Sequence, residues 1–188
     1  IGDNLPLSFK KYNYLNPAIM YSFNIYDLYL SIANYFTKKN KHCILLTSEE
    51  AERIFSQPFN LVTIDLNGNT DGIMLVRYPD LFEELEENGR PLRSGLAIQN
   101  TWVCVEESIL DNCLEKVDQF TGVLIYKQTS NENFKITEYR KANKMHDYPY
   151  PAETLTELLN IQARQYWWME NHKRKIERIM DEIEDKNL

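Results

Sequence analysis

The chain has 188 residues, of which 43% are apolar and 26% are charged, a composition that excludes a disordered polypeptide and suits one domain with a full core. Its formal net charge of -7 excludes attraction of the whole surface to nucleic acid or anionic lipid, so any such contact needs a local basic patch. The three cysteines form no Cys-x-x-Cys pair and no apolar run approaches the roughly 20 residues of a membrane span, so we expect a cytoplasmic protein without a metal or zinc site.

Composition and periodicity divide the chain into three parts. We expect an irregular N-terminal arm over residues 1–22, a core over residues 23–152, and a C-terminal helix over residues 153–188 that is a candidate oligomerisation element. Within the core, the patterns predict helices at 25–38, 48–55, 80–88 and 108–117, and strands at 42–46, 61–66, 72–76, 101–107, 120–128 and 134–142. Helices and strands do not alternate strictly, which indicates an α/β (α+β) fold with a mixed central sheet flanked by helices.

A hairpin that leads into a helix is the most specific local pattern. Two apolar strands flank Asn67-Gly68, a turn pair that tolerates positive φ, and Pro79-Asp80 then opens an acidic helix. Both strands are too continuously apolar for a solvent-facing hairpin. We therefore expect the hairpin in the middle of the sheet, covered by the helices near 25–38 and 80–88.

From Ile25 to about Met169, the order of elements and four phrases resemble the PD-(D/E)XK restriction-endonuclease-like superfamily, nearest its small phage and bacterial MmcB-like nuclease group. The phrases are LVTIDLNGNTDGI, TWVCVEESIL, FTGVLIYKQ and EYRKANKMH. The resemblance implies a restriction-endonuclease-like sheet. It also implies a metal site. An aspartate at the start of the first hairpin strand and the glutamate of a Glu-x-Lys on the second strand would hold Mg²⁺, and the lysine would steady the attacking water.

At these three catalytic positions the sequence has Asn60, Met74 and Val76. Asparagine keeps a carbonyl oxygen, but methionine does not ligate Mg²⁺ and valine supplies no charge. The sequence therefore predicts a degenerate, inactive metal site with no cofactor.

Displaced catalytic acids are an alternative. Asp65 and Asp71 flank the turn and, with Asn60, would make an oxygen-rich pocket, while Glu138 and Arg140 imitate Glu-x-Lys on a later strand. An active nuclease of this kind would use Mg²⁺. The simpler interpretation is that the two aspartates form and solubilise the turn.

Two basic clusters are candidates for contact with DNA or RNA. In a restriction-endonuclease-like fold they would face a phosphate backbone, and in an acidic protein they would equally pair with its own acidic helices. The residues are Arg90, Arg93, Arg140, Lys141 and Lys144.

The C-terminal helix carries a 4-3 heptad rhythm from Leu155 to Ile183, the pattern of a helix that pairs with another helix. About 30 helical residues measure roughly 45 Å, which is longer than a domain of this size can cover. We expect part of the helix to project and to form a homodimer or dock on a partner helix. The candidate oligomerisation residues are Tyr166, Met169, Ile176, Met180 and Ile183.

Three functions follow from the sequence. The first is a nuclease-like protein with a degenerate site that contacts nucleic acid or serves as an architectural subunit. The second is an active metal-dependent nuclease with displaced acids. The third is an acidic protein-interaction or inhibitor module without a role in nucleic-acid binding.

Overall fold

The computed structural model describes residues 24–77, 98–130, 133–147 and 151–186, and the description of residues 179 and 181–186 is confined to the backbone. The predicted arm and the predicted helix at 80–88 lie outside these ranges. The described elements, in chain order, are α2 (Ile25–Thr37), β1 (Lys41–Leu45), α3 (Ser48–Phe55), β2 (Leu61–Asp65), β3 (Thr70–Val76), β4 (Asn100–Glu106), the short 3₁₀ helix η1 (Glu107–Ile109), α5 (Leu110–Lys116), β5 (Gly122–Ser130), β6 (Asn133–Arg140) and α6 (Ala152–Lys186).

The six described strands form one sheet in the order β1-β2-β3-β4-β5-β6. Strand β2 runs antiparallel to β1 and β3, strands β3, β4 and β5 are parallel, and β6 is antiparallel to β5. The β2–β3 hairpin is therefore interior to the sheet, as its two apolar runs predict. The α+β class, with a mixed sheet, flanking helices and a long C-terminal helix, is confirmed.

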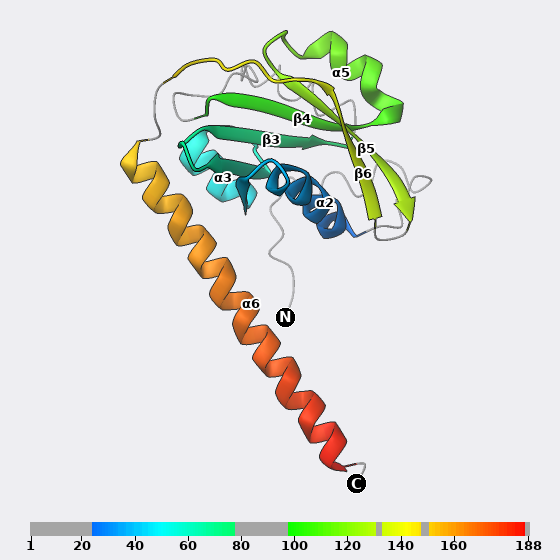
Figure 1. Ribbon diagram of the computed structural model, residues 1–188, viewed down its shortest axis with the longest axis vertical. Helices are drawn as coiled ribbons and strands as arrows, with labels where there is room; N and C mark the ends of the chain where they lie inside the picture. The colour runs from blue at the N-terminus through cyan, green and yellow to red at the C-terminus, as the bar shows by residue number, and fades with distance from the viewer. Residues whose placement is uncertain (1–23, 78–97, 131–132, 148–150, 187–188) are drawn as a thin grey trace.

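Helix α2 fills the concave face of the sheet. The side chain of Asn24 accepts a hydrogen bond from the backbone N–H of Tyr26 and caps the helix, because the first N–H groups of a helix have no partner within it. Leu28, Ile32 and Phe36, spaced by four residues, are buried. The helix contacts β1, β2 and also β6, so the sheet curls until both of its edge strands meet α2 (Figure 1).

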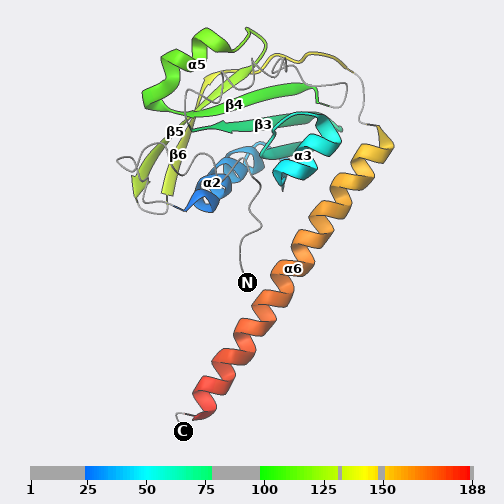
Figure 2. The same cartoon turned by 180° about the vertical axis from the view of Figure 1, so that it is seen from behind.

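The opposite face is covered by α5. Cys113 and Val117 pack with alternate residues of the parallel strands, among them Met74, Val103 and Val123. Because successive side chains of a strand point to opposite faces, these residues cannot also reach the α2 side. Figure 2 shows α5 and α2 on opposite sides of the strands.

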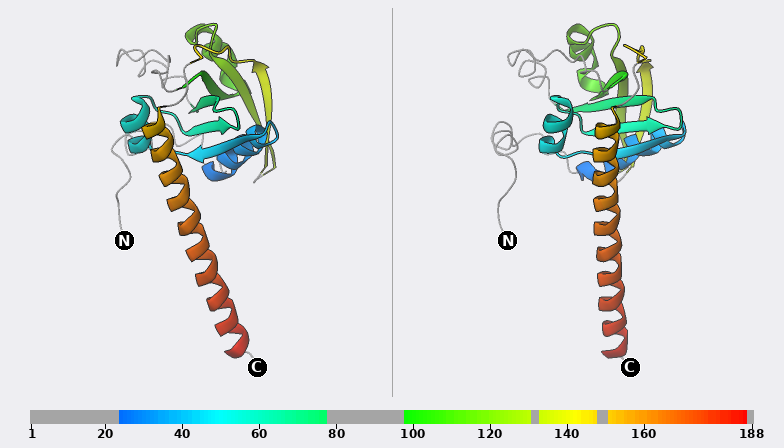
Figure 3. Two further views of the ribbon diagram at one scale, coloured as in Figure 1. Left: turned by 60° about the vertical axis from the view of Figure 1, so that its left-hand side comes forward. Right: turned by 90° about the vertical axis from the view of Figure 1, so that its left-hand side faces the viewer.

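A third apolar cluster joins α3, the β1–β2 side of the sheet and the start of α6. Thr47 and Glu50 form the predicted capping box at the start of α3. Phe55 of α3 then packs with Leu158 and Ile161 of α6. Beyond this contact α6 extends far from the sheet, and its C-terminal end is the most distant part of the described chain (Figure 3).

Candidate functional site

The hairpin positions that the resemblance assigned to catalysis are occupied by core and structural groups. Met74 is 1% exposed and Val76 is fully buried, and both pack in the cluster under α5. Asn60 accepts a hydrogen bond from the Leu75 backbone N–H at 2.7 Å through Oδ1 and donates to the Tyr29 hydroxyl at 3.3 Å through Nδ2. The amide thus ties β3 to α2, and the two apolar side chains belong to the core on the α5 side.

Tyr29 and Arg77 lie near Asn60 on the α2 side. Burial raises the pKa of the Tyr29 phenol, and the positive charge of Arg77 and the hydrogen bond with Asn60 oppose that rise. Arg77 is therefore close to Tyr29 on the face opposite to Met74 and Val76, as strand alternation requires.

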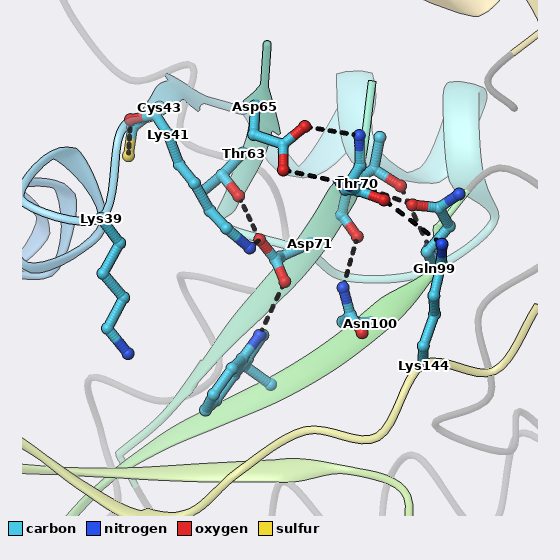
Figure 4. Close-up of polar contacts among 12 residues, drawn as sticks. Lys39, Lys41, Cys43, Thr63, Asp65, Thr70, Asp71, Gln99, Asn100 and Lys144 are labelled. Atoms are coloured by element: carbon cyan, nitrogen blue, oxygen red, sulfur yellow. Dashed lines mark hydrogen bonds and ion pairs between the residues drawn. The ribbon is translucent and has the colours of Figure 1, made fainter. Parts of the chain in front are cut away.

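Asp71 has a very different role from the turn residue that the sequence suggested. Strand β3 begins at Thr70 rather than at residue 72, so Asp71 lies inside the sheet and is only 1% exposed. Its carboxylate accepts hydrogen bonds from Thr63 Oγ1 at 2.5 Å and from Trp102 Nε1 at 3.0 Å, and it pairs with the Lys41 ammonium. These donors come from β2, β4 and β1, so one carboxylate joins four neighbouring strands (Figure 4).

The position of Trp102 depends on a glycine in the next strand. Gly122 pairs with Trp102 across β4 and β5, and a Cβ atom at Gly122 would lie 2.3 Å from the Trp102 ring. Such a distance is well inside van der Waals contact, so only glycine lets the indole lie flat against the strand. The indole nitrogen is thereby held against Asp71.

A second polar group joins the end of α2 to β6. Glu138 Oε2 accepts hydrogen bonds from Lys39 Nζ and from the Tyr35 hydroxyl, both at 2.6 Å. The hydrogen bond from Lys39, followed by that from Tyr35, lowers the pKa of Glu138 below its ordinary value of 4.5. Lys39 also lies 5.9 Å from the centre of the Trp102 ring, so the two polar groups are neighbours on the concave face.

The remaining candidate acids and bases bind separate partners. Asp65 accepts hydrogen bonds from the backbone N–H groups of Asn67 and Asn69 and forms the turn. Burial acts to raise the pKa of the Asp65 carboxyl, but the hydrogen bonds from Asn69 and Asn67 outweigh burial and lower the pKa. Arg140 donates to the backbone oxygens of Thr121 at 2.9 Å and Asp118 at 2.7 Å, whereas Glu138 accepts from Lys39. The hydrogen bonds of the candidate acids, of Asn60 and of Arg140 therefore go to other residues and not to one another.

Two of the predicted basic residues, Arg140 and Lys144, make internal contacts. Arg140 fastens the loop before β5, and Lys144 pairs with Asp147 at 2.6 Å and donates to Asn69 at 3.3 Å. Lys141 is exposed. The other two members, Arg90 and Arg93, lie outside the described residues.

A shallow cavity of about 310 Å³ lies beside the hairpin turn. Its polar lining comes from Asn67, Asn69, Gln99, Lys144 and Asp147. Sequence reasoning missed it because its walls come from four separate segments of the chain. Its lysine and aspartate already neutralise each other.

The three cysteines are structural. Burial raises the pKa of Cys43 and of Cys113 to about 11, and it also raises the pKa of the fully buried Cys104. Thiolates are the reactive form of cysteine, so these groups are unsuited to nucleophilic work at neutral pH. In the part of the chain that the structure describes, no group of three or more His, Cys, Asp or Glu side chains is placed to hold a metal ion.

The predicted oligomerisation residues form an exposed stripe on α6. Tyr166 and Met169 are each 57% exposed, Ile176 is 61% exposed and Met180 is 54% exposed, while the side chain of Ile183 is outside the description. The helix docks on its own domain through other residues: Leu158 and Ile161 are buried, and Gln165 Nε2 donates to the Leu45 backbone oxygen at 2.6 Å.

Comparison with known proteins gives a fold and no function. No family model matches the chain, and no curated protein matches it. The chain is similar in structure to the SPO1766 protein of unknown function from Silicibacter pomeroyi, with a TM-score of 0.52 and 11% sequence identity over 78% of this chain and 88% of that one. Among the described helices, none is both long and apolar enough to cross a membrane.

Proposed function

We propose that this protein is an architectural subunit: a nuclease-like domain without metal-dependent catalysis, assembled through α6. The observation that carries the proposal is the stripe of large apolar side chains on α6, which stays more than half exposed although the helix already docks on its domain by another face. Fully burying such a side chain contributes about 1.5–3 kcal/mol. A partner that covers the stripe would therefore gain substantial binding energy.

The geometry of the hairpin supports the non-catalytic part of the proposal. The positions that resemble Glu-x-Lys hold Met74 and Val76, which pack in the core, and a buried unpaired charge there would cost several kcal/mol. The acids that were candidates for a displaced site are each engaged elsewhere: Asp71 with three strands, Asp65 with the turn and Glu138 with α2. These contacts favour structural roles for all three carboxylates.

The test is to compare the intact chain with a chain that ends after Glu170, using light scattering to measure mass. The shorter chain keeps the docking residues Leu158 and Ile161, so it should fold, give the same near-ultraviolet circular dichroism and have the mass of one chain. The intact chain should have a larger mass than its own 22.3 kDa. Equal monomeric masses for the two chains would refute the assembly role.

The rival function is tested in the same preparation. Incubation of the intact chain with duplex DNA, single-stranded DNA and RNA, with Mg²⁺ or Mn²⁺, should leave each substrate uncut. Cleavage that a chelator abolishes would establish the active nuclease instead. Binding of uncut nucleic acid that weakens steeply with salt would add a nucleic-acid role to the architectural one.

A further inference from the structure

Two separate stripes run along α6. The docking stripe, defined by Leu158, Ile161 and Gln165, contacts the domain, and Arg164 on the same side pairs with Glu50 at 3.2 Å. The second stripe, which we call the seam, begins beside the domain and continues past it. Its residues are Leu159, Gln162, Tyr166, Met169, Lys173, Ile176 and Met180.

The seam keeps one period throughout. Its spacing alternates between three and four residues over about three heptads, or roughly 32 Å of helix. A helix that only covers its own domain needs an apolar face no longer than the contact, yet Leu159 is already 52% exposed where α6 still touches the domain. A constant 3.5-residue period is the pattern of a helix that winds around another helix.

The docked domain leaves the seam accessible. At 100° per residue, the mean direction of the docking stripe lies about 75° around the helix from that of the seam. Leu159, Tyr166 and Met169 of the seam are each more than half exposed although the docking stripe beside them contacts the domain, so the domain leaves the seam open to a second helix. Figure 3 shows the long free portion of α6 standing clear of the sheet.

We propose that the seam binds the seam of a second copy of this chain, with the two α6 helices parallel and in register. This inference rests on the proposed architectural function and names its partner. In such a pair the Met169 and Ile176 side chains of the two copies meet at the axis. The two nuclease-like domains then lie at the same end of the rod, on its outside.

The glutamates that flank the seam favour the parallel orientation. Glu170 and Glu177 follow Met169 and Ile176 on one flank, and His172 lies on the other. In a parallel pair, the histidine flank of one helix lies against the glutamate flank of the other. A residue on the histidine flank then faces the residue five positions later in the partner. His172 then lies beside the partner's Glu177, whereas an antiparallel pair would set the glutamate flanks of both copies against each other.

Lys173 fixes the register at a cost in stability. It is the one charged member of the described seam, and a single lysine at such a position is known to specify register while weakening a coiled coil. Its ammonium lies 3.9 Å from the Glu177 carboxylate of its own chain. The ammonium therefore points toward the glutamate flank, while the apolar part of the Lys173 side chain lies on the seam. The pair can therefore close around Lys173 without burying the ammonium.

The first test is the variant Lys173→Leu, measured by analytical ultracentrifugation. Leucine at this place removes the unfavourable charge from the axis, so the dissociation constant of the dimer should fall about tenfold or more. The matched control is Lys175→Leu, which adds the same side chain off the seam and should leave the constant unchanged. Unchanged or weaker association of Lys173→Leu would overturn self-pairing through the seam.

The second test measures orientation. In the variant Ile176→Cys, a parallel in-register pair brings the two new thiols together, and mild oxidation should give a disulfide-linked dimer in high yield, whereas Trp167→Cys, off the seam, should not cross-link. The native thiols of Cys104 and Cys113 are buried, and the native chain, oxidised in parallel, measures any cross-linking through the partly exposed Cys43. A dimer by ultracentrifugation that does not cross-link at position 176 would overturn the parallel register and leave the architectural function standing. A monomer would overturn both.

Discussion

Asp71 shows how much of this fold depends on one buried carboxylate. Lys41, Thr63 and Trp102 reach it from three different strands, so the polar contact adds side-chain bonds to the backbone ladders of β1 to β4. A buried ion pair contributes little net stability compared with an apolar replacement, but removal of one partner is costly because the other stays buried and uncompensated.

The variant Asp71→Asn should accordingly lose about 2–4 kcal/mol in the free energy of unfolding, because the amide leaves Lys41 without its charge partner. Urea unfolding followed by far-ultraviolet circular dichroism measures the loss. The matched control is Asp147→Asn, since the Asp147 side chain is 92% exposed and a surface ion pair contributes little to stability. Equal small losses for both variants would show that Asp71 is not a structural centre.

A substitution at Met74 distinguishes a filled core position from an open catalytic site. Because its side chain is 1% exposed and packs under α5, Met74→Glu should cost about 3 kcal/mol or more, or prevent folding. Leu66→Glu introduces the same group at a position that is 87% exposed and should be nearly neutral. If Met74→Glu is as stable as Leu66→Glu and binds Mg²⁺, the hairpin is an open metal site and the structural interpretation is wrong.

At the scale of elements, Glu138 joins the end of α2 to β6. Its pKa is lowered in the folded protein by Lys39 and then Tyr35, so the carboxylate contributes stability that is complete above its ordinary value of 4.5 and is lost as the pH falls through the lowered value. The gap in unfolding free energy between the native chain and Glu138→Gln should therefore be constant near neutral pH and shrink in acid. Urea unfolding at several pH values below 6 measures it, and a gap that widens in acid would contradict this role.

Local patterns were enough to predict most helices and strands. The spacing of Leu28, Ile32 and Phe36 predicts α2, the Thr47–Glu50 pair predicts the start of α3, and the two apolar runs predict an interior hairpin; each is a signal between neighbours in sequence. The role of Asp71 could not be predicted in the same way. Its partners Lys41 and Trp102 are about thirty residues away on either side, and only the strand register brings them together.

Helix α6 illustrates a different limit. The heptad rhythm correctly predicted a long helix and a stripe that the domain leaves exposed, but it did not identify Leu158 and Ile161 as the docking residues. The helix carries two apolar stripes near its start, and spacing alone does not say which one meets the sheet. The candidate nuclease positions show the same limit, because residue type predicted the loss of Mg²⁺ ligands while the burial of Met74 and Val76 depends on α5.

At the scale of the whole molecule, the described chain consists of a domain built on one curled sheet and a projecting rod, the free part of α6. The concave face of the sheet is filled by α2, the opposite face is covered by α5, and the buried Asp71 is bonded to three neighbouring strands. Large apolar side chains instead gather on the free part of α6. This distribution places the largest exposed apolar stripe on the rod, and the proposed assembly function rests on that stripe.

The most direct measurement of that function is the mass of two matched variants by light scattering at equal concentration. Ile176→Glu places a charge on the seam, and Trp167→Glu places the same charge on an exposed apolar residue off the seam, at 59% exposure compared with 61% for Ile176. If α6 assembles the protein through the seam, Ile176→Glu should have the mass of a single chain, 22.3 kDa, while Trp167→Glu keeps twice that mass. The same mass for both variants and the native chain would contradict it.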